Sequence, residues 1–271
     1  MSDKTELPIG IFDSGVGGLT VVRQIRRVLP HEDIVYLGDT ARVPYGTKSP
    51  ATVIRFATED TRFLVQQNVK AVVVACNTAS AWALPTLECE FQIPVFGVII
   101  PGAEAALKHS KTRRIGVIGT SATIRSQAYN KAILASDANA LVFSQACPLL
   151  VPLVEEGRLD DNITRLVLEE YLTPLMLNRI DALVLGCTHY PLLKGALQQV
   201  AGPGVSLVDS AESCAAYVRE KLEALQLLAR ERQRPGTIRP FVTDEVERFG
   251  DLANRFLGSQ TEQVWRVDLP T

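Results

Sequence analysis

The chain has 271 residues, of which 46% are hydrophobic and 21% charged, with a formal net charge of −2. This composition is typical of a folded protein with a large core, and so small a charge gives no reason to expect nucleic acid or a membrane surface as partner. No run of about 18 apolar residues predicts a membrane-spanning helix, and the N-terminal residues lack the apolar core of a signal peptide. We therefore expect a cytoplasmic protein.

Strand-like apolar segments alternate with helical segments along the chain, which favours an α/β fold with mainly parallel sheets. A first series has predicted strands at 9–12, 34–37, 71–75 and 95–99, with helices ending near residue 28, spanning about 50–68 and ending near residue 90. A second series has strands at 115–119, 140–143, 182–186 and 205–208, with helices after Thr120 or Ser121 and at about 160–178. The tail predicts helices at about 211–231 and 244–257, a polar loop at 230–236, and strands near 238–242 and 263–267.

Two cysteines occupy equivalent positions in the two series. Cys76 and Cys187 each follow an apolar strand and precede a predicted helix. Open α/β sheets bind ligands at the carboxyl ends of their strands. Two half-length α/β units around a cleft would let these turns face each other, whereas one continuous sheet would keep them apart. The repeat favours the cleft.

The residues around the two thiols predict a small anion-binding pocket. A helix N-terminus favours the thiolate form of a cysteine beside it. Asn77-Thr78 and Thr188-His189 supply amide and hydroxyl donors, and the loop 13–18 adds backbone N–H groups and a carboxylate. On position alone, turn or surface chemistry explains Asp13 and Glu155 equally well.

Other interpretations of these motifs are weaker. The glycines at 15–18 are too few for a dinucleotide loop, and no Gly-Lys-Ser/Thr follows them. Three histidines and widely spaced cysteines make a zinc site improbable. A thiol hydrolase using Cys187 with His189 would leave Cys76 without a role. The other three cysteines, Cys89, Cys147 and Cys214, are expected to be buried packing residues rather than disulfide partners.

Five segments resemble the signature blocks of the bacterial glutamate racemase family, in the family's order. They are Asp-Ser-Gly-Val-Gly-Gly (13–18), Gly-Asp-Thr-Ala-Arg-Val-Pro-Tyr-Gly (38–46), Ala-Cys-Asn-Thr-Ala-Ser-Ala (75–81), Pro-Leu-Val-Glu-Glu-Gly (152–157) and Leu-Gly-Cys-Thr-His-Tyr-Pro-Leu (185–192). The resemblance implies an isomerase without cofactor or metal that interconverts L- and D-glutamate and supplies the D-isomer for peptidoglycan. It also implies two pseudo-symmetric α/β domains, 1–98 with 209–271 and 99–208, an active site in the cleft between them, and a possible homodimer.

The resemblance assigns roles residue by residue. Cys76 would deprotonate D-glutamate with help from Asp13, and Cys187 would deprotonate L-glutamate with help from His189 and Glu155. Glu156 beside Glu155 leaves the last assignment open. Substrate binding is assigned to Asp13, Ser14, Tyr45, Gly46, Asn77, Thr78, Thr188 and His189. An acid and a base on opposite faces of the α-carbon are what inversion by proton transfer needs.

Three alternatives remain open at this point. A racemase of the same superfamily would act on aspartate, a hydantoin or a related acid. A thiol hydrolase would form an acyl-enzyme and need one cysteine. A non-catalytic binding module would hold a small anion in the same cleft without inverting it.

Overall fold

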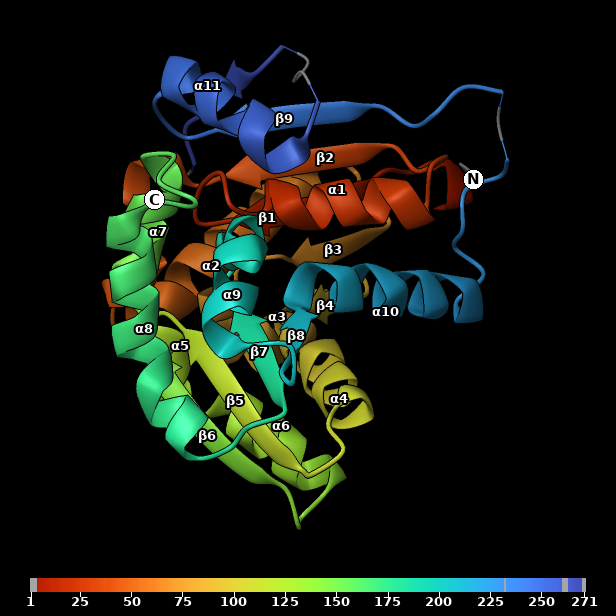
Figure 1. The fold of residues 1–271 in the computed structure, drawn as a ribbon. Coiled ribbons are helices and arrows are strands. Elements are labelled where there is room, and N and C mark those ends of the chain that lie inside the picture. Colours follow the sequence, from red (N-terminus) through yellow and green to blue (C-terminus); the bar gives the residue numbers. More distant parts are fainter. Residues whose placement is uncertain (1–3, 232, 260–262, 270–271) are drawn as a thin grey trace.

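The computed structural model describes residues 4–231, 233–259 and 263–269, which form two parallel β-sheets (Figure 1). The first sheet has the strand order β10-β9-β2-β1-β3-β4 and the second β6-β5-β7-β8. The strands are β1 (Ile9–Asp13), β2 (Ile34–Gly38), β3 (Ala71–Val74), β4 (Val95–Gly97), β5 (Arg114–Gly119), β6 (Leu141–Ala146), β7 (Ala182–Gly186), β8 (Ser206–Asp209), β9 (Ile238–Val242) and β10 (Trp265–Arg266). Every pairing among the described strands is parallel, as predicted.

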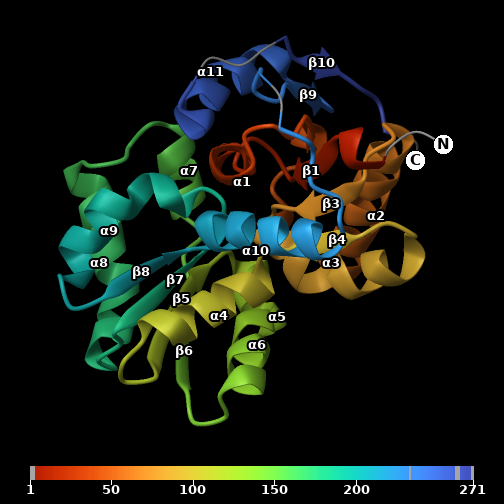
Figure 2. The ribbon, with the colours of Figure 1, turned by 90° about the vertical axis from the view of Figure 1, so that its right-hand side faces the viewer.

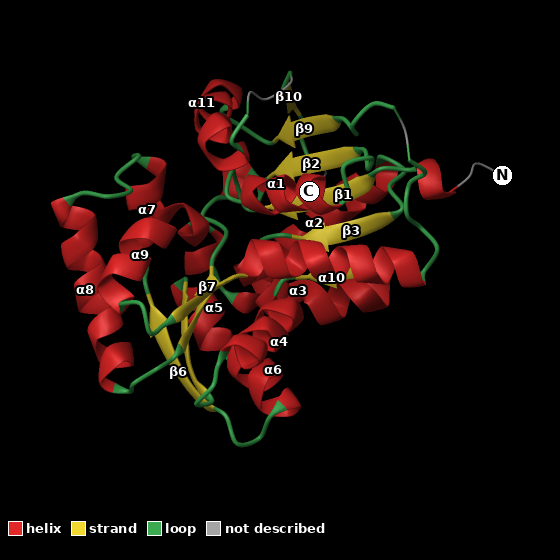
Figure 3. Ribbon diagram, turned by 45° about the vertical axis from the view of Figure 1, so that its right-hand side comes forward, coloured by secondary structure: helices red, strands yellow, loops and turns green. Residues whose placement is uncertain are grey.

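Helices pack around both sheets. Figure 3 shows the two sheets as separate groups of strands. The α-helices are α1 (Leu19–Val28), α2 (Pro50–Gln66), α3 (Asn77–Glu90), α4 (Ile99–His109), α5 (Ser121–Ser126), α6 (Ala128–Ser136), α7 (Leu150–Glu155), α8 (Asn162–Leu177), α9 (Lys194–Ala201), α10 (Ser210–Ala224) and α11 (Val246–Leu257). Single 3₁₀ turns are η1 (Lys4–Glu6), η2 (Thr40–Arg42), η3 (Tyr45–Thr47) and η4 (Tyr190–Leu193). In the described part of the chain, no helix is both long and apolar enough to span a membrane.

The central strands carry the cores of the two sheets. Strands β1, β3 and β7 are buried along their whole length, which explains why they read as continuous apolar runs rather than alternating ones. Helices then start where side chains satisfy the first free N–H groups. Thr120 accepts from the Thr123 N–H at α5, and Asp209 accepts from the Ala211 N–H at α10. Thr120, not Ser121, is therefore the N-cap of the helix after β5.

The chain leaves the first sheet and later returns to it. Strands β4 and β5 belong to different sheets, as do β8 and β9, and α10 contacts both α1 and α4. Figure 2 shows α10 running between the two layers. On this basis we propose domain boundaries at 98/99 and 208/209.

Several predicted elements differ from the observed ones. The strand expected at 95–99 ends at Gly97, and Ile99 opens helix α4, which was not predicted. Pro101 lies in the first turn of α4, where proline is tolerated. Helix α10 ends at Ala224 instead of near residue 231, because Gln226 has φ +56° and the Leu227 N–H bonds back to Leu222 O at 2.8 Å. Arg232 of the predicted loop 230–236 lies outside the described residues.

The three cysteines outside the repeated turns do not share one environment. Cys147 and Cys214 are buried, as expected of packing residues. Cys89 is exposed in the last turn of α3, so its predicted burial was wrong. A helical pattern alone did not show that its side of α3 faces solvent.

Candidate active site

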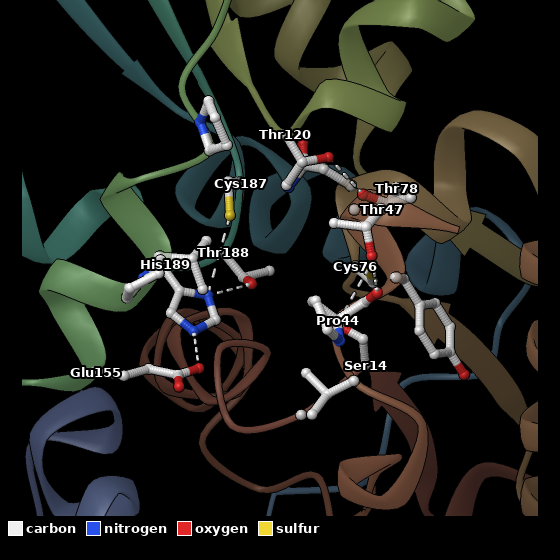
Figure 4. A pocket seen from close by; sticks show the side chains of 18 of the residues that line it. Ser14, Pro44, Thr47, Cys76, Thr78, Thr120, Glu155, Cys187, Thr188 and His189 are labelled. Atoms are coloured by element: carbon white, nitrogen blue, oxygen red, sulfur yellow. Dashed lines mark hydrogen bonds and ion pairs between the residues drawn. The ribbon is translucent and has the colours of Figure 1, made fainter. Parts of the chain in front are cut away.

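One cavity of about 390 Å³ collects the carboxyl ends of strands from both sheets. All of the predicted site residues except Asp13 line it. Figure 4 shows Cys187, His189 and Glu155 to one side and Cys76, Ser14 and Pro44 to the other. The expectation that the two cysteine turns share a cleft is met by this geometry. The chemical roles of the lining residues stay predictions.

Cys76 lies at the junction of β3 and α3. It is the N-cap residue of α3, and its carbonyl accepts the Ser80 N–H at 2.8 Å. Its thiol donates to Ser14 Oγ at 3.8 Å. Burial raises the pKa of the Cys76 thiol to about 12, and the charge of Asp13 raises it further, against a lowering by nearby backbone and Ser14 hydrogen bonds. The backbone at the start of α3 lowers the pKa of Cys76, as expected of a helix N-terminus, but desolvation outweighs this effect.

Asp13 lies behind the cavity, between the two halves of the site. Its Oδ2 accepts the Gly15 N–H at 3.1 Å, and its Oδ1 accepts from Thr188 Oγ1 at 3.4 Å. Burial raises the pKa of the Asp13 carboxyl, and the charge of His189 works against that shift. The negative charge of Asp13 raises the pKa of both Cys76 and Cys187. Asp13 thus acts on both thiols rather than on Cys76 alone.

Cys187 begins a chain of polar contacts. Its Sγ lies 3.9 Å from His189 Nδ1, and His189 Nε2 lies 3.0 Å from Glu155 Oε1. Burial raises the pKa of the Cys187 thiol, while the hydrogen bond with His189 is the main cause that lowers the pKa of Glu155. Glu155 contacts His189, whereas Glu156 lines the cavity without such a contact in the described structure. This difference favours Glu155 over Glu156 as the carboxylate that supports His189.

Asn77 and Thr78 join helix α3 to the second half of the molecule. Asn77 Oδ1 accepts from Tyr129 Oη at 2.7 Å, and its Nδ2 donates to Ser210 Oγ at 3.4 Å. The Thr78 hydroxyl lies 2.9 Å from that of Thr120. These contacts fix the two side chains where they line the cavity, so a ligand would meet preoriented amide and hydroxyl groups.

Tyr45 and Gly46 line the cavity in a different way from that expected of binding side chains. The Tyr45 hydroxyl is buried between the carboxyl groups of Asp39 and Asp60, 2.8 Å from Asp60 Oδ2, so it is already engaged with other groups. A Cβ on Gly46 would lie 2.7 Å from Thr120 Cβ. Gly46 therefore lets the loop approach the N-terminus of α5, and the backbone is what this segment offers a ligand.

Part of the cavity lining was not predicted from the sequence. The missed residues are Gly15, Val43, Pro44, Thr47, Thr120, Ser121, Pro148, Val151, Pro152, Glu156 and Arg248. Thr120 follows the end of β5, so the rule that placed Cys76 and Cys187 at strand ends also applies to it. Arg248 comes from α11, and no local pattern connects that helix with a cleft.

Comparison with known proteins identifies the class of this fold and site. Residues 17–218 match the family model for Asp/Glu/Hydantoin racemase. A glutamate racemase from Syntrophus aciditrophicus is 52% identical over 262 residues, covering 97% of each chain. The solved structure of a glutamate racemase isoform from Bacillus anthracis is 44% identical, with a TM-score of 0.94 over 98% of this chain and 99% of that one. The Francisella tularensis glutamate racemase solved with D-glutamate is 39% identical, with a TM-score of 0.90, covering 97% and 98%.

The fold and these matches define an amino-acid racemase, an isomerase with an α/β fold that contains two parallel β-sheets. The chain belongs to the Asp/Glu/Hydantoin racemase family and, within it, to the glutamate racemases. The resemblance of the five sequence blocks is thereby confirmed.

Proposed function

We propose that the protein interconverts L- and D-glutamate by moving the α-proton between two thiols. The main observation in support of this proposal is that Cys76 and Cys187, each 6% exposed, line one cavity from opposite sheets. In the D-to-L direction, Cys76 thiolate takes the α-proton and becomes a thiol. The Cys187 thiol then delivers its proton to the opposite face of the carbanion and becomes a thiolate. The reverse direction exchanges the roles, so charge and protons balance.

The raised pKa values of both thiols set the main problem for this mechanism. A buried thiolate needs a positive charge close by, and the ammonium group of glutamate supplies one when it enters the cavity. The same binding event displaces water and surrounds the developing carbanion with fixed donors. Ser14, Asn77, Thr78, Thr188 and the backbone of Tyr45-Gly46 are the donors we assign to the substrate.

Three side chains tune the thiols in this proposal. Asp13 holds its charge near both cysteines and favours return of the proton to the thiolate. His189, oriented through its Nε2 by Glu155, presents Nδ1 to the Cys187 thiol. We assign Glu155 to orienting His189 rather than to contacting substrate.

We further propose that the D-glutamate enters peptidoglycan synthesis, which family membership supports. Depleting the protein in its host is then expected to stop wall growth unless D-glutamate is supplied. Survival without D-glutamate would contradict this role. A homodimer stays a prediction from the resemblance, and a cytoplasmic location stays a prediction from the sequence.

The central experiment is racemisation in ²H₂O without added cofactor. L- or D-glutamate is incubated with purified protein while circular dichroism follows the loss of optical activity and mass spectrometry follows deuterium at the α-carbon. We expect both enantiomers to reach a racemic mixture, with one solvent deuteron in each inverted molecule. Inversion without deuterium would exclude proton transfer through exchangeable thiols, and preference for aspartate in the same assay would redirect the substrate assignment.

A further inference from the structure

Helix α11 reaches the cavity from the C-terminal tail, outside residues 17–218 that match the family model. It packs on α1, and its Phe249 ring lies 6.0 Å from that of Tyr36 in β2. Helix α11 is thus anchored on the first sheet. Figure 2 shows its other end beside α7, which belongs to the opposite side of the cleft.

Arg255 of α11 binds the last turn of α7. Its Nη1 donates to Val154 O and to Glu155 O, each at 3.0 Å. Carbonyls at a helix C-terminus have no partner within their own helix, so a guanidinium there satisfies them and complements the helix dipole. The following turn fits the same group closely, because Gly157 has φ +74° and a Cβ on it would lie 2.9 Å from Arg255 Nη2. The backbone of Glu155 is therefore held from α11.

Arg248, two turns earlier in α11, approaches the side chain of Glu155. Its Nη2 lies 3.6 Å from Glu155 Oε2, while Glu155 Oε1 contacts His189. The positive charge of Arg248 contributes to lowering the pKa of Glu155. Within the described lining of the cavity, Arg248 is the one lysine or arginine. The two oxygens of Glu155 are thus divided between α11 and the histidine.

Phe256 of α11 contacts His189 itself. The two rings meet edge to face, with centroids 5.0 Å apart and an interplanar angle of 79°. Phe256 is fully buried, so its ring has little freedom to move away. It limits rotation of the imidazole about its own axis. Helix α11 therefore touches Glu155 at its backbone and carboxylate, and His189 at its ring.

We propose that α11 is the positioning element of the Cys187 half of the site. Arg248 and Arg255 hold Glu155, Phe256 holds the ring of His189, and together they keep His189 Nδ1 facing the Cys187 thiol. None of the three is a catalytic residue, since each acts through Glu155 or His189. This inference rests on the proposed two-thiol function.

The test uses the two proton transfers separately. The enantiomers have equal free energy in water, so the overall equilibrium constant is one and any variant must change kcat/KM equally in both directions. The primary deuterium isotope effects on kcat/KM, in contrast, can change differently in the two directions. Substrate deuterium is removed by Cys187 from L-glutamate and by Cys76 from D-glutamate. When the Cys187 transfer becomes slower, it limits turnover more, and the Cys76 transfer limits it less.

We expect Arg248→Gln and Arg255→Gln to lower kcat/KM about tenfold, the effect of one weakened charged hydrogen bond. The primary isotope effect on kcat/KM should rise above the wild-type value with α-deuterated L-glutamate and fall below it with α-deuterated D-glutamate. Arg248→Lys should restore most of the activity and the wild-type isotope effects. Arg239→Gln, at an exposed position of β9, removes the same charge without contacting the cavity and should match wild type.

The outcomes separate this inference from the proposed function. Lower activity with both isotope effects unchanged would overturn the positioning role, as would wild-type kinetics in both glutamine variants. If Arg255→Gln does not fold, the exposed Arg248 still provides the test, because its loss leaves the α7 backbone contacts in place. A wild-type protein that does not racemise glutamate would defeat the proposed function before any variant is made.

Discussion

The two halves of the cleft place a thiol in similar positions but support it differently. Around Cys76, the polar neighbours Ser14 and Asp13 come from the end of β1, the adjacent strand of the same sheet. Around Cys187, the supporting groups come from three places: the turn after β7, the end of α7 and, across the cleft, helix α11. The Cys76 half is therefore assembled within one sheet, whereas the Cys187 half depends on packing between distant segments.

The local backbone differs as well. Cys76 is the residue directly before α3, whereas Thr188, His189 and the turn η4 separate Cys187 from α9. That extra turn brings His189 back beside the thiol, a neighbour Cys76 does not have in the described structure. Two similar sequence segments thus provide two thiols with different proton partners. We expect the halves to respond differently to substitution.

The largest effect should come from removing either thiol. Cys76→Ser and Cys187→Ser should each lower racemisation by about 10³-fold or more, within the range for losing a general acid or base. The remaining thiol keeps one half-reaction, so Cys187→Ser should still exchange the α-proton of D-glutamate in ²H₂O and Cys76→Ser that of L-glutamate. Proton NMR of each enantiomer measures the exchange. Equal exchange of both enantiomers by both variants would remove the distinction between the halves.

Glu155→Gln should have the next largest effect. The amide carries no negative charge to hold His189 Nε2, so kcat should fall about 10- to 100-fold, as for the loss of a charged hydrogen bond. Glu156→Gln is the matched control on the next residue, and it should lower kcat much less because Glu156 has no contact with His189 in the described structure. Steady-state kinetics in both directions provide the comparison. Equal losses would mean that charge in the cavity, not orientation of His189, is what matters.

The pH dependence of alkylation tests the buried environment of Cys76. Since its pKa is raised to about 12, nearly all of it is thiol at neutral pH, and its thiolate fraction should rise about tenfold per pH unit between pH 7 and 10 without a plateau. Iodoacetamide labelling, in a Cys89→Ser background that removes the exposed thiol, followed by peptide mass spectrometry, measures the rate at each cysteine. A plateau near pH 8 would show that the helix N-terminus outweighs burial after all.

The smallest effect should come from the contact that joins the halves at Thr120. Thr120→Val removes the cap of α5 and one of the two hydroxyl partners of Thr78, and should lower the free energy of unfolding by about 1–2 kcal/mol. Urea denaturation measures the change. Thr173→Val, at an exposed position in α8, is the control and should stay within about 0.5 kcal/mol of wild type. An equal loss in both variants would mean that Thr120 contributes no more than an ordinary surface hydroxyl.

The sequence by itself determined the parallel strands and the positions of the two thiols. The apolar runs ending at Cys76 and Cys187 are local patterns, and a short continuous apolar run is typical of a parallel strand that is buried on both faces. The resemblance then identified Asp13, His189 and Glu155 before their positions were known. Local patterns failed where a helix began with proline in its first turn, at α4, and where one side of α3 exposed Cys89.

Only the tertiary structure decided how each thiol is tuned. The sign of the pKa shift at Cys76 depends on how completely the protein buries the thiol, and members of its core cluster such as Phe12 and Val35 are far away in the sequence. The partners of Glu155 likewise come from Arg248 and Arg255, about a hundred residues later. Desolvation and side-chain contacts are set by packing between segments far apart in the chain, which periodicity along one segment does not encode.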